Sequence, residues 1–301
     1  MSASELLQHL IRIHDEQPDE AAEQLPGLVK AADLPTADRP KLAWLVNHML
    51  GEKRGDWRGA WTLLDKLPLE DANQTLLRHC FVAATLAGDA LAVWRLERQW
   101  RSAGAQDAEI HLLVRMGVLQ SLCGTVRLSS LLPILAETLD LLDDGTASGH
   151  DATLAMLFNN IVSTLLERED LETGNAVCWA VIWRAANAAR SFWGRAGNWV
   201  NHERAEYLLA LTANRFQRWP AGLAAADEGL GLIAANGEEA VDQAFLLLER
   251  ARAMFGLGRD EGGMAAYEAA QALAASFGSS LRPWFDGCAR RAKKKPALAG
   301  L

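Results

Sequence analysis

Apolar residues recur along almost the whole chain at spacings of three and four positions, and polar residues fill the positions between them. That period is expected where one face of an α-helix is buried. No segment shows the sustained alternation of apolar and polar residues that is typical of a β-strand. The sequence therefore predicts an all-α fold, with roughly 12 to 15 helices of ordinary length.

Short segments rich in Gly, Pro and Asp separate the helical stretches. The sequences that follow two of these segments are similar to each other. RGDWRGAWTLLDKL at 54–67 aligns with AGDALAVWRLERQW at 87–100, so that the two Gly-Asp pairs coincide and Ala60 is matched by Val93. GLGRDEGGMAAYEAAQAL at 256–273 has the same order of features, with Gly258 at the turn and Gly263 at the small-residue position. We interpret Ala60 as a small residue at a close crossing of two helices, because a larger side chain would hold the helices apart.

Similar small-residue positions can be placed along the chain at Ala21, Ala60, Val93, Ser129, Gly174, Gly222 and Gly263. This order of features resembles the tetratricopeptide repeat family, most clearly at 41–70, 74–103 and 244–275. The resemblance implies an α-solenoid: a right-handed superhelix of about seven stacked antiparallel hairpins. The family period is about 34 residues, whereas the positions here are 33 (60 to 93) to 48 (174 to 222) residues apart. A HEAT-like solenoid, with a period of about 40–47 residues, is the alternative.

We expect one repeat array over 1–285, followed by a basic, solvent-exposed tail over 286–301. The chain has 11 Trp residues and 2 Tyr residues. The repeat pattern turns one group of these indoles toward the core: Trp44, Trp57, Trp61, Trp94 and Trp100. Trp193 and Trp199 instead flank a Gly-rich break, where an indole can serve as an anchor for a partner.

Composition narrows the possible functions of the chain. Half of its 301 residues are hydrophobic, and its formal charge of −8 argues against binding to nucleic acid or to anionic membranes. The N-terminal residues do not form a secretory signal, and no apolar run is long enough to span a bilayer. The four cysteines are widely spaced, as expected for buried thiols in a reducing compartment. We therefore expect a cytoplasmic protein.

Motifs for catalysis or for cofactor binding are missing from the sequence. It has no phosphate-binding loop, no nucleophile elbow and no His/Cys cluster at zinc spacing, so we expect no enzyme activity, cofactor or metal. The nearest approach is the segment from His202 to Glu206, in which Glu206 stands where a zinc protease helix has its second His. A small-molecule-binding or catalytic helical protein that uses 193–207 is the alternative function.

The repeat resemblance also implies a concave groove lined by the first helix of each hairpin. When the groove positions of the family are carried over one by one, the residues expected to contact a partner are Arg78, Asn159, Tyr207, Asn214, Arg215 and Arg252. The two indoles at the Gly-rich break, Trp193 and Trp199, are added to this set. Because Arg side chains suit bidentate capture of carboxylates, we expect the partner to be a protein or peptide segment that is apolar with acidic residues. The function expected is that of an interaction scaffold or adaptor, with a chaperone or sensor module as possible forms.

Overall fold

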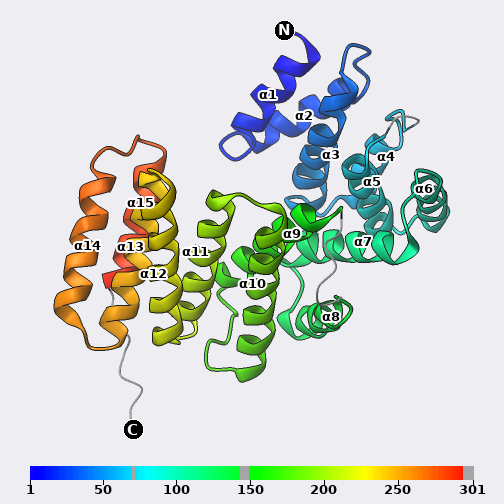
Figure 1. Ribbon diagram of the computed structural model, residues 1–301. Helices are drawn as coiled ribbons and strands as arrows, with labels where there is room; N and C mark the ends of the chain where they lie inside the picture. Colours follow the sequence, from blue (N-terminus) through cyan, green and yellow to red (C-terminus); the bar gives the residue numbers. More distant parts are fainter. Residues whose placement is uncertain (70–71, 143–148, 294–301) are drawn as a thin grey trace. The chain divides into compact units, whose positions relative to one another are not determined.

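The computed structural model describes residues 1–69, 72–142 and 149–293, and every regular element in these ranges is helical (Figure 1). The all-α prediction is confirmed for these residues, which form 15 α-helices and two short helical segments. Contacts between helices group the chain into two compact units, unit 1 (Met1–Thr125) and unit 2 (Val126–Leu301). Within the described residues, no helix combines the length and the apolar character needed to cross a membrane.

The helices of unit 1, with the short segments η1 and η2 among them, are α1 (Ala3–Ile13), α2 (Pro18–Val29), η1 (Thr36–Asp38), α3 (Arg39–Val46), η2 (Asn47–Glu52), α4 (Trp57–Leu64), α5 (Gln74–Ala87), α6 (Ala90–Ser102) and α7 (Asp107–Leu122). Those of unit 2 are α8 (Leu128–Asp140), α9 (Asp151–Glu167), α10 (Ala176–Ala196), α11 (Trp199–Arg215), α12 (Trp219–Asn236), α13 (Ala240–Gly256), α14 (Asp260–Ala274) and α15 (Leu281–Lys293).

Unit 2 is built from antiparallel neighbours. The pairs α9–α10, α11–α12 and α13–α14 pack together, and α10–α11 and α12–α13 join one pair to the next. Contacts also join α9 to α11, α11 to α13 and α13 to α15, so these four helices form one layer. In Figure 1 the helices from α10 to α14 stand side by side in chain order.

The predicted Gly-Asp turns are confirmed in unit 1, and local chemistry accounts for them. Gly55 and Gly88 have φ values of +70° and +76°, a left-handed conformation that glycine adopts without strain. Asp56 and Asp89 then cap α4 and α6, each accepting a hydrogen bond from the main-chain nitrogen three residues ahead, at 2.8 and 3.0 Å. Each turn therefore ends one helix and starts the next within a few residues.

Some of the predicted small-residue positions lie where helices approach closely, whereas Ser129 and Gly174 are exposed, and a Cβ atom added to Gly174 would meet no atom within 4 Å. Ala60 on α4 is fully buried. A Cβ atom added to Gly222 of α12 would lie 2.1 Å from Asn214 Oδ1, and one added to Gly263 of α14 would lie 2.6 Å from the Phe255 ring. Both contacts join the second helix of a pair to the first, which is the crossing that the sequence pattern predicts.

Replacing Ala60 with Leu is expected to lower the free energy of unfolding by about 1–3 kcal/mol, because the fully buried site has no space for three more carbon atoms. Chemical denaturation monitored by circular dichroism measures the change. Ala180→Leu, at an exposed position in the second turn of α10, is the matched control and should be close to neutral. Equal stability of the two variants would contradict a close crossing at Ala60.

Two expectations about the outer residues are wrong. Trp94 is 63% exposed, because the buried face of α6 is formed by Ala92, Leu96 and Trp100, and position 94 lies about half a turn away from it. The tail expected from 286 is helical up to Lys293, since α15 buries Phe285, Cys288, Ala289 and Ala292 against its neighbours. Residues 294–301 lie outside the described part of the chain.

Candidate partner-binding surface

The selected residues divide between the two units. Arg78 belongs to α5 of unit 1, and the other seven belong to unit 2. Arg78 is only 5% exposed, and burial lowers the pKa of its guanidinium to about 10. Its neighbour on α7 is Gly117, where an added Cβ would lie 3.9 Å from Arg78 Nη1. Arg78 is thus an interior residue of the α5–α7 contact and not part of an open surface.

In unit 2 the layer formed by α11, α13 and α15 repeats one arrangement of side chains. Each helix carries an aromatic residue, namely Tyr207, Phe245 or Trp284, and a polar residue seven positions later, namely Asn214, Arg252 or Arg291. A separation of seven residues keeps the two side chains on one helical face. The spacing between helices is 38 residues (207 to 245) and then 39 residues (245 to 284).

The aromatic side chains form a continuous row across the layer. Ring centroids lie 6.3 Å apart for Tyr207 and Phe245, and 4.4 Å apart for Phe245 and Trp284. Phe245 is buried, Tyr207 is half-buried and Trp284 is 53% exposed. The row therefore passes through the core at Phe245 and ends at the surface of α15 with an exposed indole.

Arg215 lies at the end of α11, beside the end of α9. Its Nε donates to the carbonyl oxygen of Leu166 at 3.2 Å, and its Nη2 donates to that of Arg168 at 3.4 Å. Within the described residues it forms no ion pair with a carboxylate. Burial, followed by the positive charges of Arg252 and Arg291, lowers its pKa. Arg215 is therefore a partly desolvated cation that is held in place by main-chain dipoles alone.

The other two arginines of this layer also lack a close carboxylate partner. Arg252 Nη1 lies 3.9 Å from Glu249 Oε2, at the outer limit of an ion pair. Arg291 Nη2 donates to Cys288 Sγ at 3.1 Å. Arg215, Arg252 and Arg291, here called the arginine face, thus concentrate positive charge on a protein whose formal charge is −8.

Asn214 lies beneath the arginine face and is fully buried. Its Nδ2 donates to the main-chain oxygen of Glu249 and to Glu249 Oε2, both at 2.8 Å. These bonds hold α11 to α13, so Asn214 supports the surface from below and has no part in touching a partner. Asn159 is half-buried on α9, in the same layer.

Tyr207 is held in a less polar environment than a surface tyrosine. Burial, followed by the negative charge of Glu249, raises the pKa of its hydroxyl well above the usual value of 10. The hydroxyl therefore stays protonated at neutral pH.

In the segment 193–207, the side chains of His202 and Glu206 contact different partners. His202 Nε2 lies 3.0 Å from the carbonyl oxygen of Trp193, and Glu206 pairs with Arg190 of α10. Trp193 and Trp199 are both half-buried, and the Trp199 ring lies against Gly237. Only part of each indole ring is therefore open to a partner.

Glu203 is a buried carboxyl group that the sequence did not single out. It is fully buried, and neither of its oxygens has a hydrogen bond of good geometry among the described residues. Burial raises its pKa, and the nearby carboxylate of Asp242 raises it further. Asp242 is itself held by Arg204 at 2.9 Å. Both effects favour the protonated form of Glu203 in the folded protein.

Sequence reasoning missed two further features. Arg291 was assigned to a basic tail, although its spacing of 39 residues from Arg252 repeats the 38 residues between Asn214 and Arg252. The fold also brings donor atoms of His14, Asp15 and His48 within 4.8 Å of one another, which is the one such group of metal-ligand type found in the described residues. The histidines are 34 residues apart (14 to 48), so spacing gave no signal.

Comparison with known proteins adds no assignment. No family model matches the chain, and no relative is found among curated protein sequences. The resemblance to tetratricopeptide repeats therefore rests on the residues themselves.

Proposed function

We propose that this protein is an interaction scaffold that binds an acidic, partly apolar protein segment across the arginine face. The observation that carries the proposal is the row of arginines on α11, α13 and α15, in which Arg215 has only main-chain carbonyl partners. A carboxylate from a partner would supply the negative charge that this site lacks. Guanidinium groups bind carboxylates through two parallel hydrogen bonds, so the match is directional as well as electrostatic.

The apolar part of the segment would lie on the end of the aromatic row. Trp284 is 53% exposed and lies seven residues before Arg291, on the same face of α15. An exposed indole beside a cation is a combination that is enriched in the energetically important parts of interfaces. Half-buried Tyr207 and Asn159 would contribute contacts along the same layer.

The tetratricopeptide-like architecture is part of this proposal. Its support is the equivalence of α11, α13 and α15, with repeat spacings of 38 and 39 residues, and the close approaches at Gly222 and Gly263. A repeated first-helix face of this kind is the surface that stacked hairpins use for binding. The spacing is intermediate between those of tetratricopeptide and HEAT repeats.

The double variant Arg215→Glu/Arg252→Glu is expected to weaken partner binding at least tenfold, about 1.4 kcal/mol, because it replaces two cations with two anions in the proposed site. Partners are first captured from a lysate of the native host on the wild-type chain and mapped to a segment. Titration calorimetry on that segment then gives the affinities. The charge-preserving variant Arg215→Lys/Arg252→Lys should lose less, since ionic attraction remains while the bidentate geometry is lost.

The matched control for net charge is Arg12→Glu/Arg98→Glu, which changes two exposed residues of unit 1 by the same charge. It should bind as the wild type does, and all variants should keep their helicity and melting temperature. If the folded Arg215→Glu/Arg252→Glu variant binds undiminished, the arginine face is not the site, and the edge formed by Trp193 and Trp199 becomes the place to examine.

A small-molecule site in 193–207 is the second candidate, favoured by one observation, the buried carboxyl group of Glu203. Strongly shifted pKa values concentrate at functional sites. The complete enclosure of Glu203 argues for a structural role instead. Native mass spectrometry of the protein from its host tests this candidate, since a bound small molecule that is lost in Glu203→Gln would support it.

A further inference from the structure

Two histidines of unit 1 are brought together by tertiary packing. His14 follows directly after α1, and His48 lies in η2, a π-helical segment in which Lys53 N donates to His48 O at 2.9 Å. Their ring centroids are 5.2 Å apart. Such π-helical insertions are rare, and they are frequent at functional sites.

The indole of Trp44 fixes both imidazole rings. It stacks on His48 with an interplanar angle of 6°, and it meets His14 edge to face, with centroid distances of 5.5 Å in both cases. The His14 side chain is 14% exposed and that of His48 is 24% exposed. The rings are therefore held in place without being closed off from solvent.

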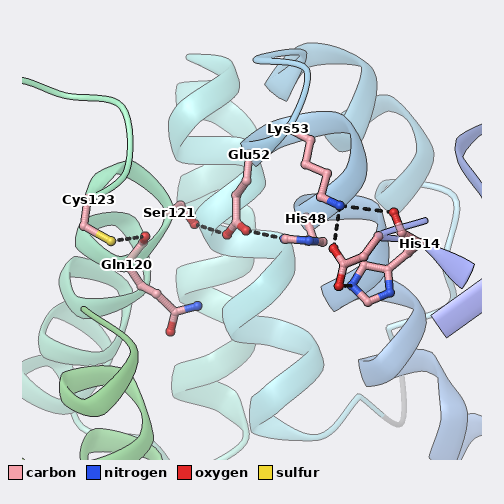
Figure 2. A network of polar contacts seen from close by, with 8 residues as sticks. His14, His48, Glu52, Lys53, Gln120, Ser121 and Cys123 are labelled. Carbon is pink, nitrogen blue, oxygen red and sulfur yellow. Dashed lines mark hydrogen bonds and ion pairs between the residues drawn. The ribbon is translucent and has the colours of Figure 1, made fainter. Parts of the chain in front are cut away.

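Hydrogen bonds select the same tautomer for both histidines. His14 Nδ1 lies 2.6 Å from the carbonyl oxygen of Ile11, and His48 Nδ1 lies 2.7 Å from Glu52 Oε2. A carbonyl oxygen and a carboxylate can only accept, so each Nδ1 carries a proton, and in the neutral form of each ring Nε2 is the nitrogen with the lone pair that a metal ion needs. Figure 2 shows His48 between Glu52 on one side and His14 on the other.

Glu52 is in turn oriented by α7. Ser121 Oγ donates to Glu52 Oε1 at 3.2 Å, which completes a chain from Ser121 through Glu52 to His48 (Figure 2). A carboxylate that accepts the Nδ1 proton of a histidine is the usual outer support of a metal-bound imidazole, because it fixes the ring and makes Nε2 more basic.

We propose that His14, Asp15 and His48 form a binding site for a divalent transition metal, with Zn²⁺ as the ion best suited to it. Two imidazole nitrogens and one carboxylate oxygen are a donor set that zinc accepts, with water in the fourth position. His14 Nε2 lies 3.5 Å from Asp15 Oδ2, close to the separation of two ligands on one tetrahedral ion. The three donor atoms lie within 4.8 Å of one another, so a bound ion draws the more distant donors closer by up to about 1.5 Å.

Asp15 can make that movement because its side chain is 73% exposed and lies in the turn between α1 and α2. Lys53 opposes the movement of Asp15, because its Nζ donates to Asp15 Oδ1 at 2.8 Å and to the carbonyl oxygen of His14 at 3.1 Å. The ammonium group leaves Asp15 Oδ2 for the metal but repels a cation. Since the ligands come from the α1–α2 turn and from η2, a bound ion fastens these two parts of unit 1 together.

The test uses the full chain, stripped of metal with a chelator and titrated with Zn²⁺ by calorimetry. The wild type should bind one Zn²⁺ per chain, and Zn²⁺ should raise its melting temperature. His14→Gln and His48→Gln should lose both responses, whereas His111→Gln, which changes an exposed histidine of the same unit, should keep both. Co²⁺ should bind at the same site and give an absorption spectrum without the thiolate bands that cysteine ligands produce.

Three milder variants keep the test decisive if a histidine variant fails to fold. Asp15→Asn should weaken Zn²⁺ binding, because it removes a charged ligand from an exposed turn. Glu52→Gln should weaken it about tenfold by removing the outer support of His48. Lys53→Met should strengthen it, since the competing cation is gone. The proposal is overturned if the wild type takes up no Zn²⁺, or if folded variants at His14, Asp15 and His48 all bind Zn²⁺ as tightly as the His111→Gln control.

Discussion

Replacing Glu203 with Gln is expected to stabilise the protein at pH 8 by about 2–4 kcal/mol, and to have little effect near pH 5. Burial and, after it, the neighbouring Asp242 raise the pKa of Glu203 from 4.5 to about 9. The native state therefore holds this proton to higher pH than the unfolded chain does. Its stability falls as the pH rises from about 4.5 toward 9, and Gln removes that dependence because it cannot ionise.

Urea denaturation of the wild type and of Glu203→Gln across this pH range measures the difference. The two curves of unfolding free energy against pH should coincide at the acidic end and separate steadily above it. Glu268→Gln, which changes an exposed residue of α14, is the matched control and should run parallel to the wild type. Parallel curves for Glu203→Gln as well would mean that Glu203 is ionised in the native state.

Replacing Asn214 with Ala is expected to lower the free energy of unfolding by about 2–4 kcal/mol, because it leaves the buried carboxylate of Glu249 without its main donor. Asn214 Nδ2 makes two hydrogen bonds of 2.8 Å to Glu249, and the Glu249 residue is only 6% exposed. Chemical denaturation at pH 7 measures the loss.

The double variant Asn214→Ala/Glu249→Leu should recover part of that loss. An apolar pair needs no internal hydrogen bond, whereas a single orphaned carboxylate carries its full desolvation penalty. A double-mutant cycle that also includes Glu249→Leu gives the coupling energy of the pair. Strictly additive effects would contradict a direct Asn214–Glu249 interaction in solution.

Much of the secondary structure could be predicted from the sequence because its causes are local. The Gly55-Asp56 and Gly88-Asp89 pairs set a left-handed residue and a helix cap within two positions, and both turns form as expected. The same holds for the small residue Gly222, whose close approach to Asn214 follows from the hairpin itself. Such features depend on neighbours within a few residues or within one helical pair.

The candidate surface could be predicted only in part. Helical spacing predicts that Arg215 and Arg252 lie in one layer. It does not predict whether Asn214, the polar residue next to Arg215, is exposed or buried. The extent of α15 was missed because a run of basic residues resembles a solvated tail. The burial of Phe285 and Ala292 depends on contacts of α15 with α13 and α14, which the sequence does not show. Arg291 was missed with it.

The sequence by itself determined the helical class, the Gly-Asp turns and some of the close helix crossings, because a 3.6-residue period and left-handed glycines act through adjacent residues. Tertiary structure alone decided the ionisation of Glu203, the exposure of Trp94 and the meeting of His14 with His48. Each of these depends on which face of one helix meets another, and so on groups far away in the chain that desolvate, cover or approach the side chain.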